Sequence, residues 1–397
     1  MLRFLTAGES HGQALVVIVE GLPAGLRITE KQIQDELGRR RLGFGRGPRM
    51  RFEVDQITLT AGIRHGRTLG SPVAIEIKNT EWPKWIEEMS PHPGEPTKVL
   101  SAPRPGHADL VGMQKYGFDD ARDVLERASA RETAARVAAG ALAKALLAEL
   151  GTTVLSHTVR LGDQATSIGH RPSPDDLEVI DANEVRCFDE EASTRMVAAI
   201  KAAAKVGDSL GGVSEVLAFG VPVGLGSHVH WDRKIDGLLA QAIMSIQAIK
   251  GVELGQAFEQ ATQPGSVAHD AITYDPSEDA PSGGFIRSTA RAGGIEGGMT
   301  TGGLLAVRAA MKPLASLNRP VLETVDVASK ESTVSFKERT DVTAVPAMGV
   351  VAEAMVALVL ASEALRKFGG DSVAELVRNH NAFVAHLGET PSAARAT

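Results

Sequence analysis

The chain has 397 residues, of which 43% are hydrophobic, and its formal net charge is −7. That much apolar material is sufficient for a large core, while the negative balance argues against nucleic acids and anionic membranes as partners. The single cysteine, Cys187, excludes an intrachain disulfide framework and a multi-thiolate metal site, and it is typical of cytoplasmic proteins. We expect neither export nor a membrane span, because the N-terminus reaches polar residues early and no stretch of about 18 apolar residues occurs.

Five helices are predicted from apolar periodicity and from end signals. Thr29 and Ser129 each stand three residues before a glutamine or glutamate, the spacing of a capping box, and are predicted to begin helices. The predicted helices cover residues 29–37, 129–150, 192–206, 232–250 and 347–368. The second and fifth are apolar on nearly all sides, which indicates burial on every face.

Six strands are predicted in short segments with strand-like patterning. They cover residues 14–22, 52–63, 73–79, 152–162, 214–226 and 304–313. Since they flank the apolar helices, we expect an α+β fold in which sheets enclose a core of helices. No repeat or low-complexity linker is visible, so residues 1–384 are predicted to form a single domain, and residues 385–397 a flexible tail.

Arginine is concentrated between residues 39 and 49, where five arginines occur in eleven positions. The planar guanidinium binds phosphate or carboxylate in bidentate fashion, and the interleaved glycines allow backbone amides to approach an anion. A solvated charge run and a nucleic-acid patch are the alternatives. The glycines favour a small anionic ligand over single-stranded nucleic acid, which is bound through stacking platforms.

Two histidines lie beside small or rigid residues. His11 follows Ser10 at the end of a short β-like start, where an imidazole can exchange protons near neutral pH. His107 lies in the loop 103–109, which two prolines stiffen and which also presents Arg104. An ordinary turn is the alternative for both histidines, and the residues alone do not decide between the two interpretations.

Three further segments have the composition of ligand sites. Arg127 and Arg131 flank the predicted helix start at Ser129, where free amides and the helix dipole favour an anion. The glycine-rich stretch 291–303 lacks the fingerprint of a dinucleotide fold and is better explained by close approach of the backbone to a ligand. Asp341 near Arg339 is either a proton relay or a simple ion pair. No metal-ligand spacing and no nucleophilic triad pattern occurs, so the expected ligands are polyanionic.

Taken together, these motifs resemble the chorismate synthase family. The resemblance rests on eight motifs that occur in order from residue 8 to residue 341: GESHGQALVVIVEGLPAG, RRRLGFGRG, PRPGHADL, RASARETAARVAAGA, MSIQAIKGVELG, RAGGIEGGM, AAMKP and RTD. It implies a 1,4-anti elimination of phosphate from 5-enolpyruvylshikimate 3-phosphate to give chorismate, the last common step towards the aromatic amino acids. It also implies a requirement for reduced FMN without net redox change, a β-α-β sandwich with helices between antiparallel sheets, and a homotetramer.

The resemblance implies roles for individual residues as well. His11, with Ser10 beside it, matches the histidine that protonates the departing phosphate, and His107 matches the one that protonates or holds the reduced flavin. Asp341 matches the carboxylate near flavin N5 that relays the proton from substrate C6. The candidates for binding the substrate are Arg40, Arg46, Arg104 and Arg131. Of these, Arg40 and Arg46 are also candidates for binding NADPH. The implied flavin contacts are Arg127, Ala128, Ser129, Gln247, Ala248, Gly297, Lys312, Pro313, Leu314, Ala315, Ser316 and Arg339.

Some positions depart from the family pattern. Ala290 replaces a common asparagine, Thr301 and Gly303 replace more usual polar residues, and the segment 312–316 has only one of two customary serines. These departures put some of the contacts to the FMN phosphate and ring in doubt. A non-catalytic anion binder and a flavin or NADPH oxidoreductase are the competing interpretations. The lack of a dinucleotide fingerprint favours NADPH acting through a separate flavin reductase.

Overall fold

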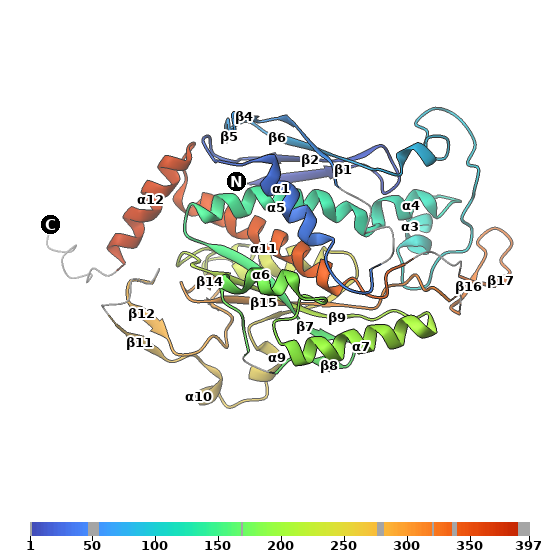
Figure 1. Cartoon of the computed structure of the whole chain (residues 1–397). Coiled ribbons are helices and arrows are strands. Elements are labelled where there is room, and N and C mark those ends of the chain that lie inside the picture. Colours follow the sequence, from blue (N-terminus) through green and yellow to red (C-terminus); the bar gives the residue numbers. More distant parts are fainter. Residues whose placement is uncertain are drawn as a thin grey trace.

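The protein has three layers. One antiparallel sheet lies on each side of a layer of long helices (Figure 1). The computed structural model describes residues 2–46, 55–167, 170–275, 282–319, 321–335 and 340–387. The arrangement confirms the predicted α+β sandwich with helices between antiparallel sheets. All six predicted strands contain a strand of the two main sheets.

The first sheet has four strands, which come from the N-terminal part of the chain. Their order is β1 (Arg3–Ala7), β2 (Ala14–Glu20), β6 (Val73–Lys78) and β3 (Ile57–Ala61), and every neighbouring pair is antiparallel. Every second side chain of β2 is buried beneath the sheet, as the alternation of a half-buried strand requires.

The second sheet has five strands and closes the other side of the helical layer. Their order is β10 (Ile249–Leu254), β15 (Leu305–Met311), β9 (Gly212–Phe219), β7 (Thr153–Leu161) and β8 (Gln164–Ala165). Consecutive residues in the middle of β7 and β9 are buried, so both faces of these strands are covered.

The helical layer consists of α1 (Glu30–Arg40), α5 (Thr133–Ala148) and α11 (Val345–Phe368). α5 packs on β2, α11 packs on β7 and β9, and the two helices pack against each other. At Gly140 a Cβ would lie 2.3 Å from the Cβ of Ala354, so the glycine is what lets α5 and α11 approach so closely. α11 is long and apolar enough to span a membrane, but 89% of its most apolar stretch is buried within the protein, as predicted for a core helix.

The remaining elements are short or peripheral. They are β4 (Ile63–Arg64), β5 (Arg67–Thr68), α3 (Asp109–Tyr116), α4 (Arg122–Ala128), α6 (Leu177–Ala182), α7 (Glu190–Val206), α8 (Ile235–Met244), α9 (Ala257–Gln260), α10 (Gly265–Ala268), β11 (Ile272–Tyr274), β12 (Phe285–Arg287), β13 (Ile295–Glu296), β14 (Met299–Thr300), β16 (Glu323–Val325), β17 (Ser332–Val334) and α12 (Val373–His386). α12 runs past residue 385, where the tail was predicted to begin, and residues 388–397 of that tail lie outside the described residues.

The predicted helix start at Thr29 is confirmed, whereas the one at Ser129 is wrong. Thr29 forms both bonds of its capping box with Gln32. Ser129 instead accepts from the backbone of Arg131 in a single 3-10 turn, and α5 begins only at Thr133. The capping box does not form because the Glu132 carboxylate is already bonded to side chains from other elements.

The predicted helix 232–250 is also too long. The structure has a 3-10 turn at Trp231–Arg233, then α8, and the chain enters β10 at Ile249. Ala248 stands between them with a φ of +66°, in the left-handed region that interrupts a helix. Residues 249–254 pair with β15, so cross-strand pairing overrides the helical pattern of the segment.

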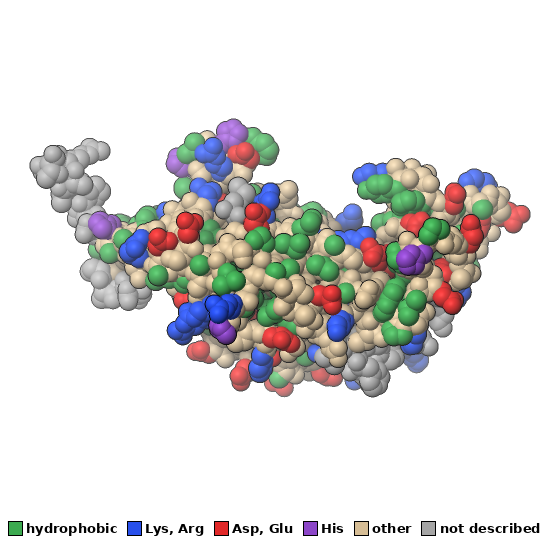
Figure 2. All heavy atoms as spheres, turned by 90° about the horizontal axis from the view of Figure 1, so that it is seen from above, with side chains coloured by type: hydrophobic (Ala, Val, Ile, Leu, Met, Phe, Trp, Pro, Cys, Tyr) green, Lys and Arg blue, Asp and Glu red, His purple; other side chains and the backbone are tan. Residues whose placement is uncertain are grey.

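The outer face of the first sheet carries apolar side chains. Figure 2 views the molecule from above this sheet and shows hydrophobic side chains gathered over the centre of the face. Leu5 and Ile18 are directly opposed on β1 and β2 and are 69% and 41% exposed.

Candidate active site

His11 lies in the loop between β1 and β2 and is fixed against α4. Its backbone N–H donates to Glu126 Oε2 and its ring Nδ1 contacts Glu126 Oε1, both at 2.8 Å. The backbone N–H of Ser10 donates to the carbonyl oxygen of the same glutamate at 3.0 Å. The Glu126 side chain is 3% exposed and that of His11 is 15% exposed, so a buried carboxylate holds an imidazole that still reaches the surface of the site.

Aromatic and cationic side chains complete the surroundings of His11. The indole of Trp85 packs on the imidazole, with ring centroids 4.0 Å apart. Arg122 donates to Glu126 Oε1 at 3.1 Å and lies over the Trp85 ring, 4.9 Å from its centroid. The hydroxyl oxygens of Ser10 and Ser129 are 3.0 Å apart, which ties the histidine loop to the end of α4.

His107 has a buried carboxylate partner of its own. Its Nδ1 is bonded to Asp109 Oδ1, and the Asp109 side chain is fully buried at the start of α3. Arg104 donates to the same carboxylate from Nε at 2.8 Å and from a terminal nitrogen at 3.1 Å. Its other terminal nitrogen donates to the Ser316 hydroxyl at 3.0 Å. The loop 103–109 therefore arranges its own histidine, arginine and aspartate, and it contacts the segment 312–316.

A continuous chain of contacts joins the two histidine loops. Thr6, just before the His11 loop, donates to Glu132 at 2.7 Å, and Glu132 accepts from Gln247 at 3.1 Å. The backbone N–H of Lys312 donates to the carbonyl of Ala248 at 3.0 Å, and Lys312 Nζ donates to the carbonyl of Gly106. We call the segments 8–12, 103–109, 245–248 and 312–316 the histidine end of the molecule. These segments are far apart in sequence but meet in the fold.

Two of the predicted arginines border the histidine end from within. Arg131 donates from Nε to Asn79 Oδ1 at 2.9 Å and forms an ion pair with Asp55. Arg40, the last residue of α1, lies 3.5 Å from the same Asp55 carboxylate and 3.4 Å from the hydroxyl of Thr133. Asn79 in turn donates to the carbonyl of Gly12 at 2.7 Å. The arginines are thereby positioned by the same residues that pin the His11 loop.

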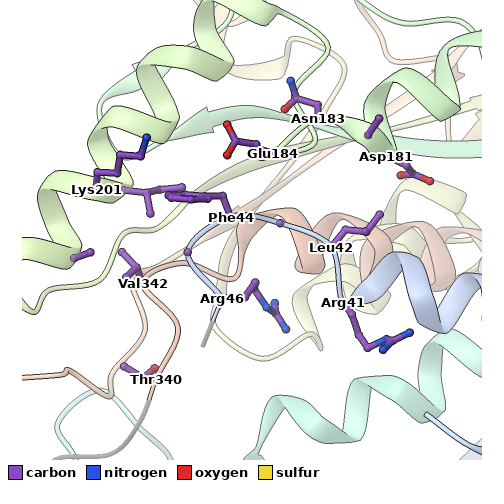
Figure 3. Close-up of a pocket in the computed structure, with 15 residues that line it drawn as sticks. Arg41, Leu42, Phe44, Arg46, Asp181, Asn183, Glu184, Lys201, Thr340 and Val342 are labelled. Atoms are coloured by element: carbon purple, nitrogen blue, oxygen red, sulfur yellow. The ribbon is translucent and has the colours of Figure 1, made fainter. Parts of the chain in front are cut away.

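Arg46 and Asp341 form an ion pair at the mouth of a pocket. Arg46 Nε lies 3.1 Å from Asp341 Oδ2. The adjacent pocket has a volume of about 630 Å³ and is lined by the loop after α1, by α7, by the turn after α6 and by the segment before α11 (Figure 3). Asn318, just after the segment 312–316, donates to the carbonyl of Thr340 at 3.4 Å, which connects this pair to the histidine end.

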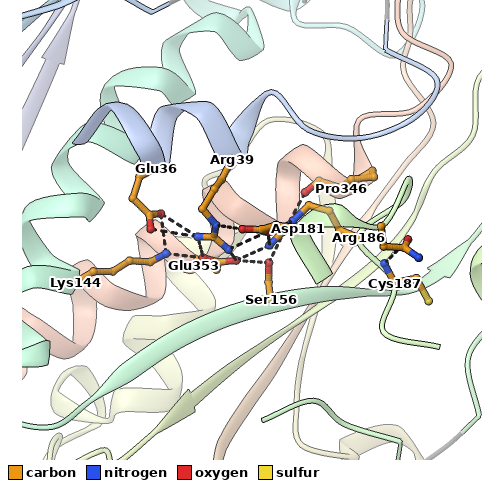
Figure 4. Close-up of polar contacts among 10 residues, drawn as sticks. Glu36, Arg39, Lys144, Ser156, Asp181, Arg186, Cys187, Pro346 and Glu353 are labelled. Carbon is orange, nitrogen blue, oxygen red and sulfur yellow. Dashed lines mark hydrogen bonds and ion pairs between the residues drawn. The ribbon is translucent and has the colours of Figure 1, made fainter. Parts of the chain in front are cut away.

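Arg39, the first arginine of the predicted anion-binding run, is not at the site. Glu353 on α11 is fully buried, and its carboxylate contacts Arg39 at 2.7 Å and Arg186 at 3.2 Å, as well as Lys144 (Figure 4). Two further carboxylates pair with these cations, and we call the six residues the Glu353 cluster: Arg39, Lys144, Arg186, Glu36, Asp181 and Glu353. The arginine-rich segment 39–49 is therefore divided. Arg39 belongs to the Glu353 cluster, whereas Arg40 and Arg46 belong to the candidate site.

Partner cations and donors hold the carboxylates of the histidine end in their charged form. Burial acts to raise the pKa of Asp109, but hydrogen bonds from His107 and Arg104 outweigh it and place the pKa well below its usual range. The pKa of Glu126 is also lowered, because the bonds from His11 and the nearby Arg122 outweigh burial. Arg40 and Arg131 likewise lower the pKa of Asp55 against the effect of burial. Anionic carboxylates thus face both imidazoles.

The segment 245–248 has features that fit a bound planar group. Gln247 donates its amide to Glu132, while its Oε1 atom is buried with no hydrogen-bond partner among the described residues. A buried unpaired acceptor is costly unless a ligand satisfies it. Next to it, Ala248 adopts a φ of +66°, a strained backbone of the kind that clusters at ligand sites. The N–H groups of a reduced flavin are suitable donors for Gln247.

Other predicted flavin contacts are more dispersed. Arg127 donates to the carbonyl of Gly8 at 2.7 Å, and Ala128 and Ser129 follow it at the end of α4. Pro313, Leu314 and Ala315 continue from Lys312 within the histidine end.

Gly297 lies apart from the other predicted flavin contacts, in the turn between β13 and β14. The neighbouring Gly298 accepts from the backbone of Ile235 at 3.0 Å, at the start of α8. Gln247 follows the other end of this helix, about 15 Å away by its length. Arg339 lies outside the described residues.

The residues that sequence reasoning missed are those that hold the histidines in place. Glu126 and Trp85 lie 115 and 74 positions from His11, and no local pattern joins them to it. Asp109 was inside a recognised motif, and its spacing two residues after His107 was the available signal for its role. Within the described parts of the chain, no group of three or more His, Cys, Asp or Glu side chains is suited to hold a metal ion.

Known proteins resemble this chain along almost its entire length. The sequence model of the family described as chorismate synthase matches residues 2–365. A protein of Salinispora tropica named chorismate synthase is 61% identical over 96% of this chain and 97% of its own length, and one of Streptomyces coelicolor is 58% identical over 97% and 98%. A crystal structure of a chorismate synthase superposes with a TM-score of 0.78 at 39% identity, covering 98% of this chain and 99% of that one.

Proposed function

Because this chain belongs to the chorismate synthase family, we propose that it eliminates phosphate in the 1,4-anti sense from 5-enolpyruvylshikimate 3-phosphate, with reduced FMN bound at the histidine end. The chain is a lyase of the shikimate pathway that acts on a small molecule. The observation that carries the finer proposal is that His11 and His107 each contact a buried carboxylate, and that a chain of contacts joins their two loops.

His11 is the proton donor to the departing phosphate in this proposal. A phosphate that leaves from an allylic carbon needs its growing negative charge neutralised, and a positioned acid contributes about 10²- to 10⁴-fold to such a step. Ser10 lies next to it and shares a hydroxyl contact with Ser129. Asp341, held by Arg46, is the acceptor for the proton that leaves C6 of the substrate.

The arginines bind the anionic groups of the substrate. Arg40, Arg46, Arg104 and Arg131 each lie against an aspartate, which fixes the guanidinium in one orientation before the substrate arrives. A preorganised planar fork is the preferred partner for phosphate and carboxylate. The N-termini of α5 and α11 lie at this same end of the layer and add the positive end of their dipoles (Figure 1).

Reduced FMN supplies the electron density that the loss of phosphate requires, without being consumed. Gln247 and Ala248 would hold its ring, with the unpaired Oε1 of Gln247 as acceptor. His107 would hold the reduced form, oriented by Asp109. The segment 312–316, with Lys312 and Ser316, and the side chain of Arg127 complete the proposed flavin contacts.

We further propose a cytoplasmic homotetramer whose flavin is reduced by a separate reductase that uses NADPH. The exposed pair Leu5 and Ile18 on the outer face of the first sheet supports an interface with another copy of the chain. The glycine-rich stretch that follows residue 291 folds into the hairpin β13–β14 and not into a dinucleotide loop, which supports a separate reductase.

An anaerobic assay tests the proposed reaction. The purified protein is given 5-enolpyruvylshikimate 3-phosphate and reduced FMN, and phosphate, chorismate and flavin oxidation are followed together. We expect equal amounts of phosphate and chorismate, no net loss of reduced flavin, and no product when flavin is omitted. Oxidation of flavin in step with a reduced product would overturn the proposal in favour of an oxidoreductase. Turnover with NADPH and oxidised FMN, without any added reductase, would overturn the proposal that a separate reductase reduces the flavin.

A further inference from the structure

Glu126 contacts the proposed acid His11 through two separate hydrogen bonds. Its Oε2 accepts from the backbone N–H of His11 and its Oε1 contacts ring Nδ1, both at 2.8 Å. Because an ionised carboxylate only accepts hydrogen bonds, Nδ1 is the donor in the second contact. In the described part of the chain the ring has a hydrogen-bond partner only at Nδ1, so Nε2 remains available to a ligand.

We propose that Glu126 is a positioning residue that holds the Nδ1–H of His11. The imidazolium then gives its Nε2 proton to the leaving phosphate, and the neutral ring that remains keeps its proton on Nδ1. The inference rests on the proposed function of His11. The buried carboxylate of Glu126 sets the tautomer of His11, orients its ring and balances the positive charge when the imidazole is protonated. A carboxylate in this relation to a catalytic histidine contributes up to about 10⁴-fold to turnover.

The surroundings of Glu126 suit this role. Three donors satisfy its two oxygens, namely the backbone and ring of His11 and the guanidinium of Arg122 at 3.1 Å. These donors explain how a side chain with 3% exposure remains charged. The other charged group facing Arg122 is Glu88, whose carboxylate lies 3.6 Å away. Trp85 covers one face of the imidazole, which prevents the ring from turning away from the carboxylate.

The substitution Glu126→Gln separates these functions sharply. An amide offers one acceptor and one donor in place of two acceptors. The amide oxygen is then the one acceptor for three donors, namely the backbone N–H of His11, its Nδ1–H and Arg122. At least one of these donors loses its acceptor, and wherever the NH₂ group faces Nδ1 the ring must carry its proton on Nε2. The variant keeps the size of the side chain but no longer fixes the Nδ1–H tautomer.

The tautomer is read directly by NMR of protein labelled with ¹⁵N-histidine, without flavin or substrate. Two-bond correlations distinguish a ring protonated at Nδ1 from one protonated at Nε2, and His11→Ala assigns the signal. We expect the Nδ1–H form in the wild type, a populated Nε2–H form in Glu126→Gln, and the wild-type form in Glu126→Asp. Glu88→Gln is the matched control, because it also removes a carboxylate beside Arg122 but does not touch His11.

Rapid-mixing measurements of phosphate release complete the test on the enzyme with reduced FMN. We expect Glu126→Gln to slow release by about 10²- to 10⁴-fold, Glu126→Asp to recover most of it, and Glu88→Gln to match the wild type. An unchanged tautomer, or wild-type release in Glu126→Gln, would overturn the inference while His11→Ala remains slow. Wild-type release in His11→Ala would instead overturn the proposed role of the histidine itself.

Discussion

The Glu353 cluster and the histidine end are both built from buried arginines and carboxylates, yet we propose only the histidine end as the active site. The Glu353 cluster lies in the middle of the helical layer, and its three cations and three carboxylates pair with one another. None of its six members is a histidine. The histidine end has two imidazoles on buried carboxylates, loops from four parts of the chain, and a buried acceptor on Gln247 that has no partner among the described residues.

The difference shows that arginine density alone does not mark a site. Arg39 and Arg40 are adjacent in sequence, but they point to the Glu353 cluster and to the carboxylate of Asp55 respectively. What distinguishes the histidine end is a titratable group held by a fixed charge, together with a polar atom left for a ligand.

The largest effect is expected from Glu353→Ala. Removing this carboxylate leaves Arg39, Lys144 and Arg186 with less negative charge in the interior, which costs about 3–5 kcal/mol of unfolding free energy. Denaturation in urea measures the loss. Glu20→Gln removes an exposed carboxylate paired with Arg3 and should cost under about 1 kcal/mol. Equal losses in the two variants would contradict the structural role of the cluster.

Arg39 and Arg46 belong to the same arginine run but lie in different regions of the fold, so replacing each one should affect a different property. Arg39→Ala should lower the unfolding free energy by about 3 kcal/mol. Arg46→Ala should cost less stability than Arg39→Ala, because its partner Asp341 is 20% exposed whereas Glu353 is fully buried. It should weaken binding of 5-enolpyruvylshikimate 3-phosphate by about 10- to 100-fold, because bonds to charged groups contribute about 1.5–3 kcal/mol. Urea denaturation and calorimetric titration are made on both variants. The opposite pattern would reverse the assignment of the two regions.

Acid should destabilise the protein through the same cluster. Burial acts to raise the pKa of Glu353, but Arg39, Lys144 and Arg186 outweigh it and the pKa is lowered. Its contribution is therefore full above the unfolded pKa of about 4.5 and is lost as pH falls through the lower folded value. Unfolding free energy should decline below about pH 5, with a slope smaller by up to about 1.4 kcal/mol per pH unit in Glu353→Gln. An identical slope in both proteins would refute the shift.

The smallest effect concerns Gln247. Replacing it with Ala removes a buried oxygen that has no partner within the described residues, so the variant loses only its bond to Glu132. We expect FMN affinity to fall about three- to tenfold, the value of one hydrogen bond of about 0.5–1.5 kcal/mol. Titration of flavin fluorescence measures it. Unchanged affinity would remove Gln247 from the flavin contacts.

Much of the fold could be predicted because the signals are local. Strand-like apolar segments indicated six of the nine described strands of the two main sheets, and the capping box at Thr29 indicated the start of α1. The errors came where tertiary contacts compete with local pattern. Glu132 is drawn to Thr6 and Gln247 and so does not cap a helix at Ser129, and residues 249–254 pair with β15.

The candidate site was predictable only to the extent that its parts lie close together in sequence. His107, Arg104 and Asp109 occur within six residues, and their mutual contacts follow from one stiff loop. The partner of His11 stands 115 residues away, on a helix that the apolar pattern did not indicate. Periodicity does not report such a contact, because it depends on how two segments are packed and not on the composition of either.

The most direct test of the account is His11→Ala, with phosphate release and FMN affinity measured on the same preparation. If His11 is the proton donor at the histidine end, phosphate release should fall by about 10²- to 10⁴-fold. The dissociation constant of FMN should change by less than about threefold, or about 0.7 kcal/mol. Equal losses in turnover and flavin affinity, or turnover at the wild-type rate, would contradict the account.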